Sequence, residues 1–207
     1  MPSDPAALSA PQRHRTELLP KLTHAFARWG YRKATTARLA EHCGVQETEL
    51  YRVWPSKQKM FLAAIDHVFD MTQAGWSDLL ESPPPAPPKP PAATVAQRLL
   101  SHQSLHQGDH GFYRIIFAGL SETDDPEIRR ALRRLYRRFH RYVVQQVAHH
   151  REAHDQPCED QQVDHDAWGL VGLAAVCDIG RSLGMLTQRE RQALMHNVGQ
   201  TLLEDES

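Results

Sequence analysis

The sequence lacks the features that mark membrane-spanning, secreted or disulfide-stabilised proteins. Its longest apolar run, from Trp168 to Cys177, has about half the length that a helix needs to cross a bilayer. The first residues contain no basic segment followed by an apolar core, so we expect no secretory signal. The 3 cysteines, Cys43, Cys158 and Cys177, are scattered, which suits a reducing compartment. We therefore expect a cytoplasmic protein that does not contact a membrane.

Motifs of the common enzyme classes are also missing. The sequence has no Gly-x-Ser-x-Gly, no glycine-rich phosphate loop and no Cys-x-x-Cys. Its hydrophobic content of 41% and charged content of 24% are those of an ordinary globular protein. We expect neither an enzyme nor a bound cofactor, although an enzyme built on a helical bundle is a possible alternative.

Charge is spread unevenly, although the formal net charge is only -1. Residues 11–60 contain ten Lys and Arg against four acidic residues, whereas residues 151–207 contain four Arg against eleven acidic residues. A basic N-terminal part and an acidic C-terminal part suit a protein that approaches phosphates in one orientation. The alternative is an uneven distribution without functional meaning.

Two short helices joined by a tight turn are predicted between residues 35 and 57. The side-chain oxygens of Thr35 and Thr36 can cap a helix start, and Gly44 suits its end because glycine tolerates a positive φ. Apolar residues at helical spacing predict one buried stripe through both helices: Leu39, Ala40, Cys43, Val45, Leu50 and Trp54. This arrangement is a helix-turn-helix.

The order of residues in this stretch resembles the tetracycline-repressor (TetR) family of DNA-binding regulators. The matching elements are Thr35-Thr36, Leu39-Ala40, Gly44-Val45, Leu50-Tyr51, Trp54 and Ser56-Lys57, and the resemblance extends back through Phe26, Gly30 and Tyr31. The resemblance implies an all-α protein with an N-terminal three-helix head that contains the helix-turn-helix. It also implies a C-terminal helical bundle that binds a ligand and forms a homodimer.

By the same resemblance, residues 46–53 are the recognition helix that enters the major groove of double-stranded DNA. Tyr51 and Lys57 would contact phosphates, and the alternative for Tyr51 is a half-buried core residue. The full set of candidate DNA-binding residues is Thr35, Thr36, Arg38, Gln46, Glu47, Thr48, Tyr51, Arg52 and Lys57.

The start of this helix departs from the usual family pattern. Gln46 is a poorer cap than the Ser or Thr of many members. Glu47 and Glu49 bring negative charge near the groove, but acids in a first turn also stabilise a helix start through its dipole.

The sequence predicts three regions. Residues 1–10 form a disordered arm, residues 11–57 the DNA-binding domain, and residues 58–207 the ligand-binding and dimerisation domain. Within the last region, the proline-rich residues 82–91 predict an extended connector. A predicted helix from Pro126 to about Arg151 carries seven arginines between residues 129 and 141. A solvated face paired with nearby acids is expected there, and anion binding is the alternative.

A small-molecule pocket in the C-terminal bundle follows from the resemblance and not from any motif. Its candidate lining residues are Phe69, Trp76, Phe112, Ile116, Leu120, Tyr136, Phe139 and Trp168, each of which can equally be a core residue.

Small residues are frequent in the helix predicted from about Val163 to Met185. Because each glycine inside a helix costs about 1 kcal/mol relative to alanine, we expect another helix to approach closely. The resemblance implies that the last two helices pair with a second copy of the chain. The candidate interface residues are Gly169, Gly172, Ala175, Gly180, Leu194 and Val198.

These observations predict a homodimeric repressor that reads an inverted-repeat operator and is released by a small apolar ligand. The alternative is a metal- or redox-responsive regulator with the same head. His102 and His106 lie four residues apart, with His110 close behind, which is acceptable ligand spacing. We predict solvated histidines rather than a metal site, and a buried structural thiol rather than a redox sensor at Cys177.

Overall fold

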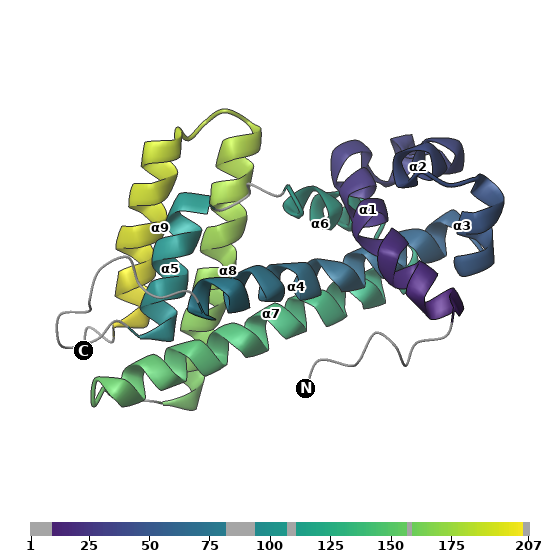
Figure 1. The fold of residues 1–207 in the computed structure, drawn as a ribbon. Helices are drawn as coiled ribbons and strands as arrows, with labels where there is room; N and C mark the ends of the chain where they lie inside the picture. The colour runs from purple at the N-terminus through teal and green to yellow at the C-terminus, as the bar shows by residue number, and fades with distance from the viewer. Residues whose placement is uncertain (1–9, 82–93, 107–110, 157–158, 205–207) are drawn as a thin grey trace. The chain divides into compact units, whose positions relative to one another are not determined.

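The computed structural model describes residues 10–81, 94–106, 111–156 and 159–204, and within these ranges the regular structure is entirely α-helical (Figure 1). The helices are α1 (Ala10–Lys33), α2 (Thr36–Cys43), α3 (Glu47–Val53), α4 (Lys57–Glu81), α5 (Val95–His106), α6 (Tyr113–Leu120), α7 (Pro126–Ala153), α8 (Asp160–Ser182) and α9 (Gln188–Leu203). The predicted all-α fold is therefore confirmed. No helix of the described part is both long and apolar enough to span a membrane.

The chain divides into two compact units. Unit 1 comprises Met1–Met71 and Gly111–Leu135, and unit 2 comprises Thr72–His110 and Tyr136–Ser207. The division falls inside α4 and α7, so each of these two helices contributes to both units. The predicted functional boundary after Lys57 stays a prediction.

Unit 1 is built around an apolar core between α1, α2, α3 and α4. Leu22, Phe26, Leu39, Leu50 and Phe61 are fully buried in it. The ring centroids of Phe26 and Phe61 lie 5.0 Å apart in an edge-to-face arrangement, which aromatic pairs prefer. α1 also packs on α2 and α6.

α1 is interrupted at Gly30. Gly30 has φ 70° and ψ 178°, outside the helical region, yet the helical segment continues to Lys33. The continuation places Tyr31 and Arg32 beside other elements of unit 1, and Arg32 forms an ion pair with Glu122 at 2.5 Å.

Capping side chains stabilise helix starts in both units. In unit 1 the Ser56 hydroxyl accepts a hydrogen bond from the Lys59 N–H at 3.1 Å, and Asp125 Oδ1 accepts from the Glu127 N–H at 2.8 Å. Backbone donors also hold the pKa of the Asp125 carboxyl below its ordinary value. In unit 2 Thr187 caps α9 by accepting from the Glu190 N–H.

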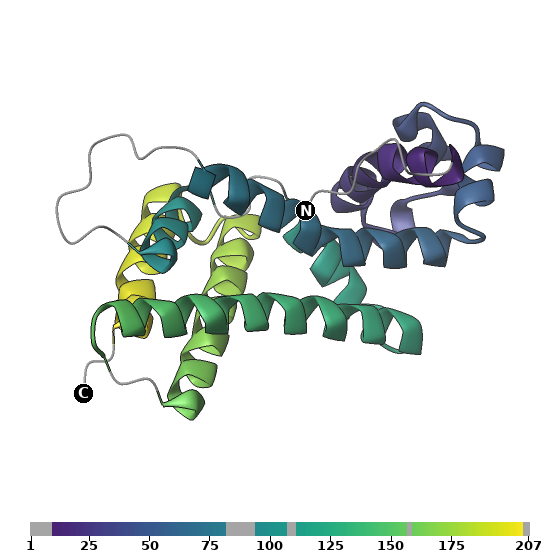
Figure 2. The same ribbon diagram turned by 60° about the horizontal axis from the view of Figure 1, so that its bottom comes forward.

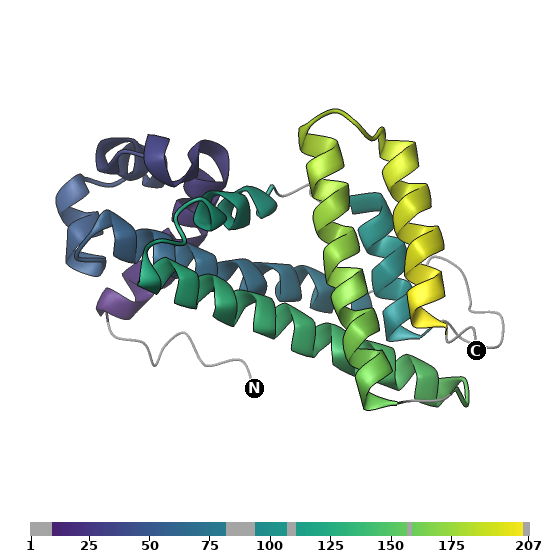
Figure 3. The same ribbon diagram turned by 180° about the vertical axis from the view of Figure 1, so that it is seen from behind.

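Unit 2 packs α5 and α8 against α9, and these helices lie side by side when the molecule is turned (Figure 2, Figure 3). Its core includes Val147, Val163, Leu173, Met195 and Leu203. A buried ion pair accompanies this apolar core, because Arg151 Nη2 donates to Asp166 Oδ2 at 2.6 Å and both side chains are shielded from solvent.

Several predictions concern residues that the structure does not describe. These are the arm over residues 1–9, the proline-rich connector 82–91, and His110 and Cys158. Residue Ala10, assigned to the arm from sequence, is the first residue of α1.

Candidate nucleic-acid interface

The turn between α2 and α3 has the geometry that its sequence predicts. Thr35 caps α2 by accepting from the Arg38 N–H at 3.3 Å. Gly44 adopts φ 73° and ψ 33° at the end of α2, and its N–H points to the carbonyls of Ala40 and Glu41. This left-handed conformation is strained for residues with a Cβ, so the tight turn depends on glycine.

Glu49 stabilises the start of α3. Gln46 is extended at the N-cap position, and the Glu49 carboxylate accepts the Gln46 N–H at 3.0 Å. The carboxylate thereby satisfies a backbone donor and lies at the positive end of the helix dipole. Glu47 and Glu49 are the two acids expected near the major groove of DNA. Glu49 therefore has a structural role, whereas Glu47 is exposed.

α3 presents its polar residues to solvent and anchors itself through Leu50. Leu50 is fully buried, and Tyr51 is 44% exposed, so Tyr51 is not a core residue. The exposed candidates on or beside this helix are Gln46, Glu47, Thr48, Tyr51 and Arg52. This one-sided burial leaves a continuous polar helix face accessible.

Two of the candidate cations are held over aromatic rings at the end of α1. The Arg38 guanidinium lies 4.4 Å from the Trp29 ring centroid. The Lys57 ammonium lies 4.6 Å from the Tyr31 ring centroid and donates to the Tyr31 carbonyl at 3.0 Å. Cation–π contacts of this kind contribute about 0.5–1 kcal/mol at exposed sites and restrict where each charge can lie.

Sequence reasoning missed the positioning role of Trp29 and Tyr31. Trp29 is half-buried, with the Arg38 guanidinium over its ring and the His42 ring centroid 5.4 Å from its own. Burial, with smaller contributions from Asp125 and Glu122, raises the pKa of Tyr31. The sequence feature that could have indicated this role is the pair of aromatic residues that flank Gly30, immediately before the helix-turn-helix.

The candidate ligand-pocket residues fall into two sets, one in each unit. In unit 1, Phe69 and Phe112 are buried, whereas Leu120 is 44% exposed. Ile116, the fourth member of this set, is partly buried. A pocket lined by all eight candidates stays a prediction.

In unit 2, Trp76 lies 6.2 Å from Phe139 and stacks on Tyr142 at 4.8 Å. Tyr142 was not among the candidates, and its pKa is raised by burial. Tyr136 is partly buried, and burial with the nearby Asp178 raises its pKa. Trp168 is exposed and stacks on His140.

At two glycines of the predicted dimer interface, side chains of the same chain leave little room for a Cβ. A Cβ at Gly169 would meet the Leu202 side chain of α9 at 3.0 Å, and a Cβ at Gly180 would meet Leu186 at 2.5 Å. Gly172 has open space around it. Ala175 and Leu194 are partly buried.

An exposed apolar stripe runs along α8, at a spacing of three or four residues. We name it the α8 stripe; its members are Trp168, Gly172, Val176, Ile179 and Leu183. Val198 of α9 is also exposed. Val176, Ile179 and Leu183 were not predicted as interface residues, although their helical spacing was available in the sequence.

Neither proposed sensor chemistry gains support from the described residues. The rings of His102 and His106 are 4.6 Å apart, but within the described ranges no three His, Cys, Asp or Glu side chains are grouped for a metal. Cys43 and Cys177 are buried, and burial raises the pKa of both thiols. A raised thiol pKa disfavours the reactive thiolate.

α2 and α3 therefore form a helix-turn-helix whose second helix has a stabilised start and a solvent-facing polar side. The sequence profile for "Bacterial regulatory proteins, tetR family" matches residues 22–64. Over these residues, which belong to unit 1, the chain resembles the regulators of this family.

The similarity to individual proteins is local in sequence and extensive in fold. The nucleoid occlusion factor SlmA of Haemophilus influenzae is 47% identical over 55 residues, which are 26% of this chain and 25% of that protein. The chain thus matches about a quarter of the length of this curated relative.

Two solved structures share the fold over most of both chains. A TetR-family transcriptional regulator from Cytophaga hutchinsonii has a TM-score of 0.73 and 16% identity, covering 95% of this chain and 96% of that one. The transcriptional regulator FadR from Bacillus subtilis, in complex with stearoyl-CoA, has a TM-score of 0.65 and 16% identity, covering 93% and 99%. At these identities the likeness concerns the fold.

Proposed function

We propose that the chain is a homodimeric transcriptional repressor that binds an inverted-repeat operator and is released by a small apolar ligand. The observation that carries the DNA-binding part is the one-sided burial of α3. Leu50 fixes this helix in the core, while Thr48, Tyr51 and Arg52 remain exposed. A helix of this kind fits the major groove, where side chains read base edges.

Different residues of the head would perform different tasks on DNA. Tyr51 and Lys57 would contact phosphates and fix the register, whereas Arg38 and Thr48 would influence which bases are preferred. The support for Lys57 is its fixed position: its bond to the Tyr31 carbonyl uses one ammonium hydrogen and leaves two others for a phosphate. Thr36 and Arg38 would flank the groove from α2.

The α8 stripe supports the dimer. Isolated exposed apolar side chains are common on protein surfaces, but a contiguous apolar row indicates an interaction site. Because the same face is present on each copy, a two-fold axis can pair the stripes of two chains. Paired heads would then read half-sites separated by about one helical turn of DNA, roughly 34–36 Å.

An apolar ligand is supported by the aromatic cluster of Trp76, Phe139 and Tyr142 in unit 2. Ligand sites are usually lined by aromatic side chains with few polar groups. The fold relative FadR binds stearoyl-CoA, so this fold accommodates a ligand with a long apolar chain. We also infer a cytoplasmic location, because the proposed operator lies on DNA.

Selection of bound sequences from random duplex DNA tests this function. We expect an inverted repeat, bound by a dimer, with an affinity that falls steeply between about 50 and 200 mM salt because bound phosphates release counterions. Thr48→Ala should change the selected sequence, whereas Gln145→Ala, an exposed change in unit 2, should not. Failure to enrich any sequence at low salt would contradict the proposal, as would a monomer that protects an inverted repeat.

A further inference from the structure

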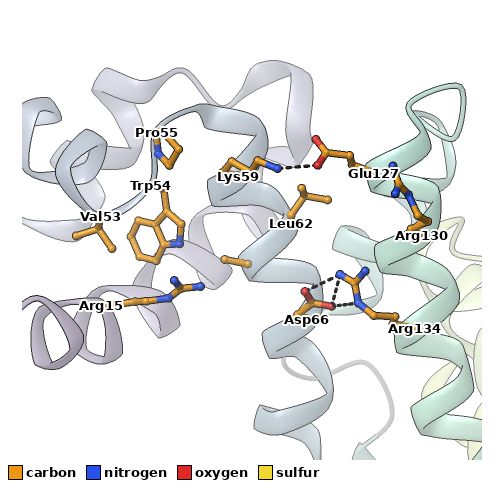
Figure 4. A pocket seen from close by; sticks show the side chains of 11 residues that line it. Arg15, Val53, Trp54, Pro55, Lys59, Leu62, Asp66, Glu127, Arg130 and Arg134 are labelled. Carbon is orange, nitrogen blue, oxygen red and sulfur yellow. Dashed lines mark hydrogen bonds and ion pairs between the residues drawn. The ribbon is translucent and has the colours of Figure 1, made fainter. Parts of the chain in front are cut away.

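Unit 1 contains a groove that the proposed DNA contacts do not use (Figure 4). Its volume is about 400 Å³, within the range of sites for small molecules. The lining comes from the start of α1, the segment joining α3 to α4, the first turns of α4 and the first turns of α7. Its lining residues include Arg15, Trp54, Leu62, Arg130 and Arg134.

The lining carries more positive than negative charge. Arg15, Lys59, Arg130 and Arg134 face this groove together with only two carboxylates, Asp66 and Glu127. Both carboxylates are already engaged, since Arg134 bridges Asp66 at 2.8 Å and Lys59 bridges Glu127 at 2.6 Å. Figure 4 shows these two ion pairs on the α4 and α7 sides of the groove.

Arg15 therefore supplies most of the unbalanced charge. Its guanidinium lies 5.7 Å from the Trp54 ring centroid. Arg130 Nε donates to the Pro126 carbonyl at 2.9 Å, and its charge is partly offset by the Asp125 carboxylate. A guanidinium carries five N–H donors in a planar fork that matches a carboxylate or phosphate. Most of these donors remain available.

Trp54 provides an independent indication of a missing acceptor. Its side chain is 2% exposed, and its indole Nε1 is buried without a hydrogen-bond partner among the described residues. In Figure 4 the nitrogen lies on the side of the ring nearest the Arg15 guanidinium. Buried donors are nearly always paired, so an acceptor beside Arg15 would satisfy a group that is otherwise unpaired.

We propose that this groove binds a small organic oxyanion, a carboxylate or phosphate attached to a flat apolar body. Arg15 and the indole N–H of Trp54 bind the oxyanion, after the exposed Arg15 side chain shifts from the ring. Arg130 lies across the groove and adds positive charge there. The apolar body lies against Val53, Pro55 and Leu62. This site is separate from the aromatic cluster of unit 2, and it does not depend on the proposed DNA binding.

The test uses 2-naphthoate as the probe and neutral 2-naphthamide as its matched control, added to the full-length protein without DNA. The four tryptophans give separate indole N–H signals in a ¹H–¹⁵N spectrum, and Trp54→Phe assigns the one at the groove. We expect 2-naphthoate to shift the Trp54 signal downfield with a Kd below about 1 mM. The amide should bind about tenfold more weakly, since charged partners make the stronger hydrogen bonds.

Variants of α1 and α7 locate the charge requirement. Arg15→Gln should weaken 2-naphthoate binding about tenfold, and Arg130→Gln, a change across the groove, should weaken it less. Arg129→Gln should not, because this exposed neighbour on α7 does not line the groove. Equal affinity for acid and amide, an unmoved Trp54 signal, or an equal loss in Arg129→Gln would overturn the proposal, as would a Trp54 signal that responds to DNA but not to 2-naphthoate.

Discussion

Unit 1 and unit 2 distribute polar and apolar groups in opposite ways. Unit 1 has a fully buried apolar core, while its ion pairs, such as Arg134–Asp66, lie at the surface. In the described part of the chain, the buried charged residues and the buried histidine all belong to unit 2: His150, Arg151, Asp166 and Asp178. Unit 2 also exposes the apolar residues of the α8 stripe.

This contrast indicates what each unit needs for stability. The apolar groups of unit 1 are already buried by its own helices. Unit 2 must balance the cost of buried charge by pairing, and the α8 stripe gains stability only when another surface covers it. The following predictions test these two requirements and then the surface of unit 1.

The largest effect should come from removing the carboxylate of the buried ion pair. Asp166→Ala leaves the Arg151 guanidinium, 1% exposed, without its charge partner. We expect the free energy of unfolding to fall by about 3–5 kcal/mol, the usual cost of leaving a buried charge unpaired. Urea unfolding followed by the fluorescence of Trp76 and Trp168, with the head tryptophans replaced by phenylalanine, measures this in unit 2.

The matched control is the surface pair of unit 1. Asp66→Ala removes the partner of Arg134, whose side chain is 56% exposed, and should cost no more than about 1 kcal/mol. The double replacement Arg151→Met with Asp166→Leu should recover much of the stability lost in Asp166→Ala. Equal costs for the two single variants would remove the contrast between the units.

The next effect concerns the α8 stripe. Ile179→Asp places a charge on this face of each copy, so a two-fold dimer acquires two buried charges. We expect the dimer dissociation constant to rise at least about 100-fold, equivalent to about 2.7 kcal/mol. Sedimentation equilibrium measures this constant, and operator affinity should fall with it.

Gln145→Glu is the control, because it adds a negative charge at an exposed position of α7 in unit 2. It should leave the dimer unchanged. If Ile179→Asp remained a dimer at micromolar concentration, the α8 stripe would not be the interface.

The local features of the head could be predicted from sequence because they depend on neighbouring residues. Thr35, Gly44 and Ser56 cap or end helices through backbone groups no more than a turn away. The cation–ring pairs were not predictable in this way, since Lys57 reaches Tyr31 across 26 positions of sequence. Such contacts depend on how the helices pack.

The small-residue pattern in α8 shows the same limit. The sequence correctly indicated close approach of other side chains, but it did not reveal that Leu202 and Leu186 approach Gly169 and Gly180 from within the chain. Aromatic residues gave still less information about the pocket, because Phe112 and Trp76 look alike in sequence yet belong to different units. Shape, not residue type, decides whether such side chains line a cavity.

A smaller effect is expected from the surface of unit 1 that we propose contacts DNA. Tyr51→Phe removes one phosphate hydrogen bond and should weaken binding of all sequences about three- to tenfold. Lys57→Ala should reduce the dependence of log affinity on log salt by about one unit. Fluorescence anisotropy over a salt series measures both.

Arg141→Gln, a charge change in unit 2, should leave affinity and salt dependence as they are. A change in base preference in Lys57→Ala without a change in salt dependence would show that Lys57 does not contact a phosphate.

The smallest effect should be the dependence of stability on pH between neutrality and mild acid. Burial lowers the pKa of His150 below its ordinary 6.5, with His154 and Arg151 acting in the same direction and Glu204 against it. Nδ1 of this ring already lies 2.7 Å from the Thr94 hydroxyl, and Nε2 is buried without a partner among the described residues. Protonation would therefore charge a ring that has little access to solvent.

The stability of unit 2 should decrease as the pH falls, because the unfolded state binds the proton first. As the pH falls below about 6.5, the unfolded chain protonates this histidine before the folded chain does, so stability decreases until the folded pKa is passed. The slope for one group is at most about 1.4 kcal/mol per pH unit, and it acts only over the interval between the two pKa values. Asp125 contributes nothing in this window, because its lowered pKa confines its effect to pH below about its ordinary 3.8.

Unit 1 supplies the comparison, since burial also lowers the pKa of His67, opposed by Asp70. His150→Gln should flatten the pH dependence measured by the unit 2 tryptophans, and His67→Gln that measured by Trp29 and Trp54. Urea unfolding at about pH 7, 6 and 5 gives the slopes. If His150→Gln kept the full slope of unit 2, the acid sensitivity of that unit would have to come from its remaining buried groups, and the buried ion pair of Arg151 and Asp166 would be the next to replace.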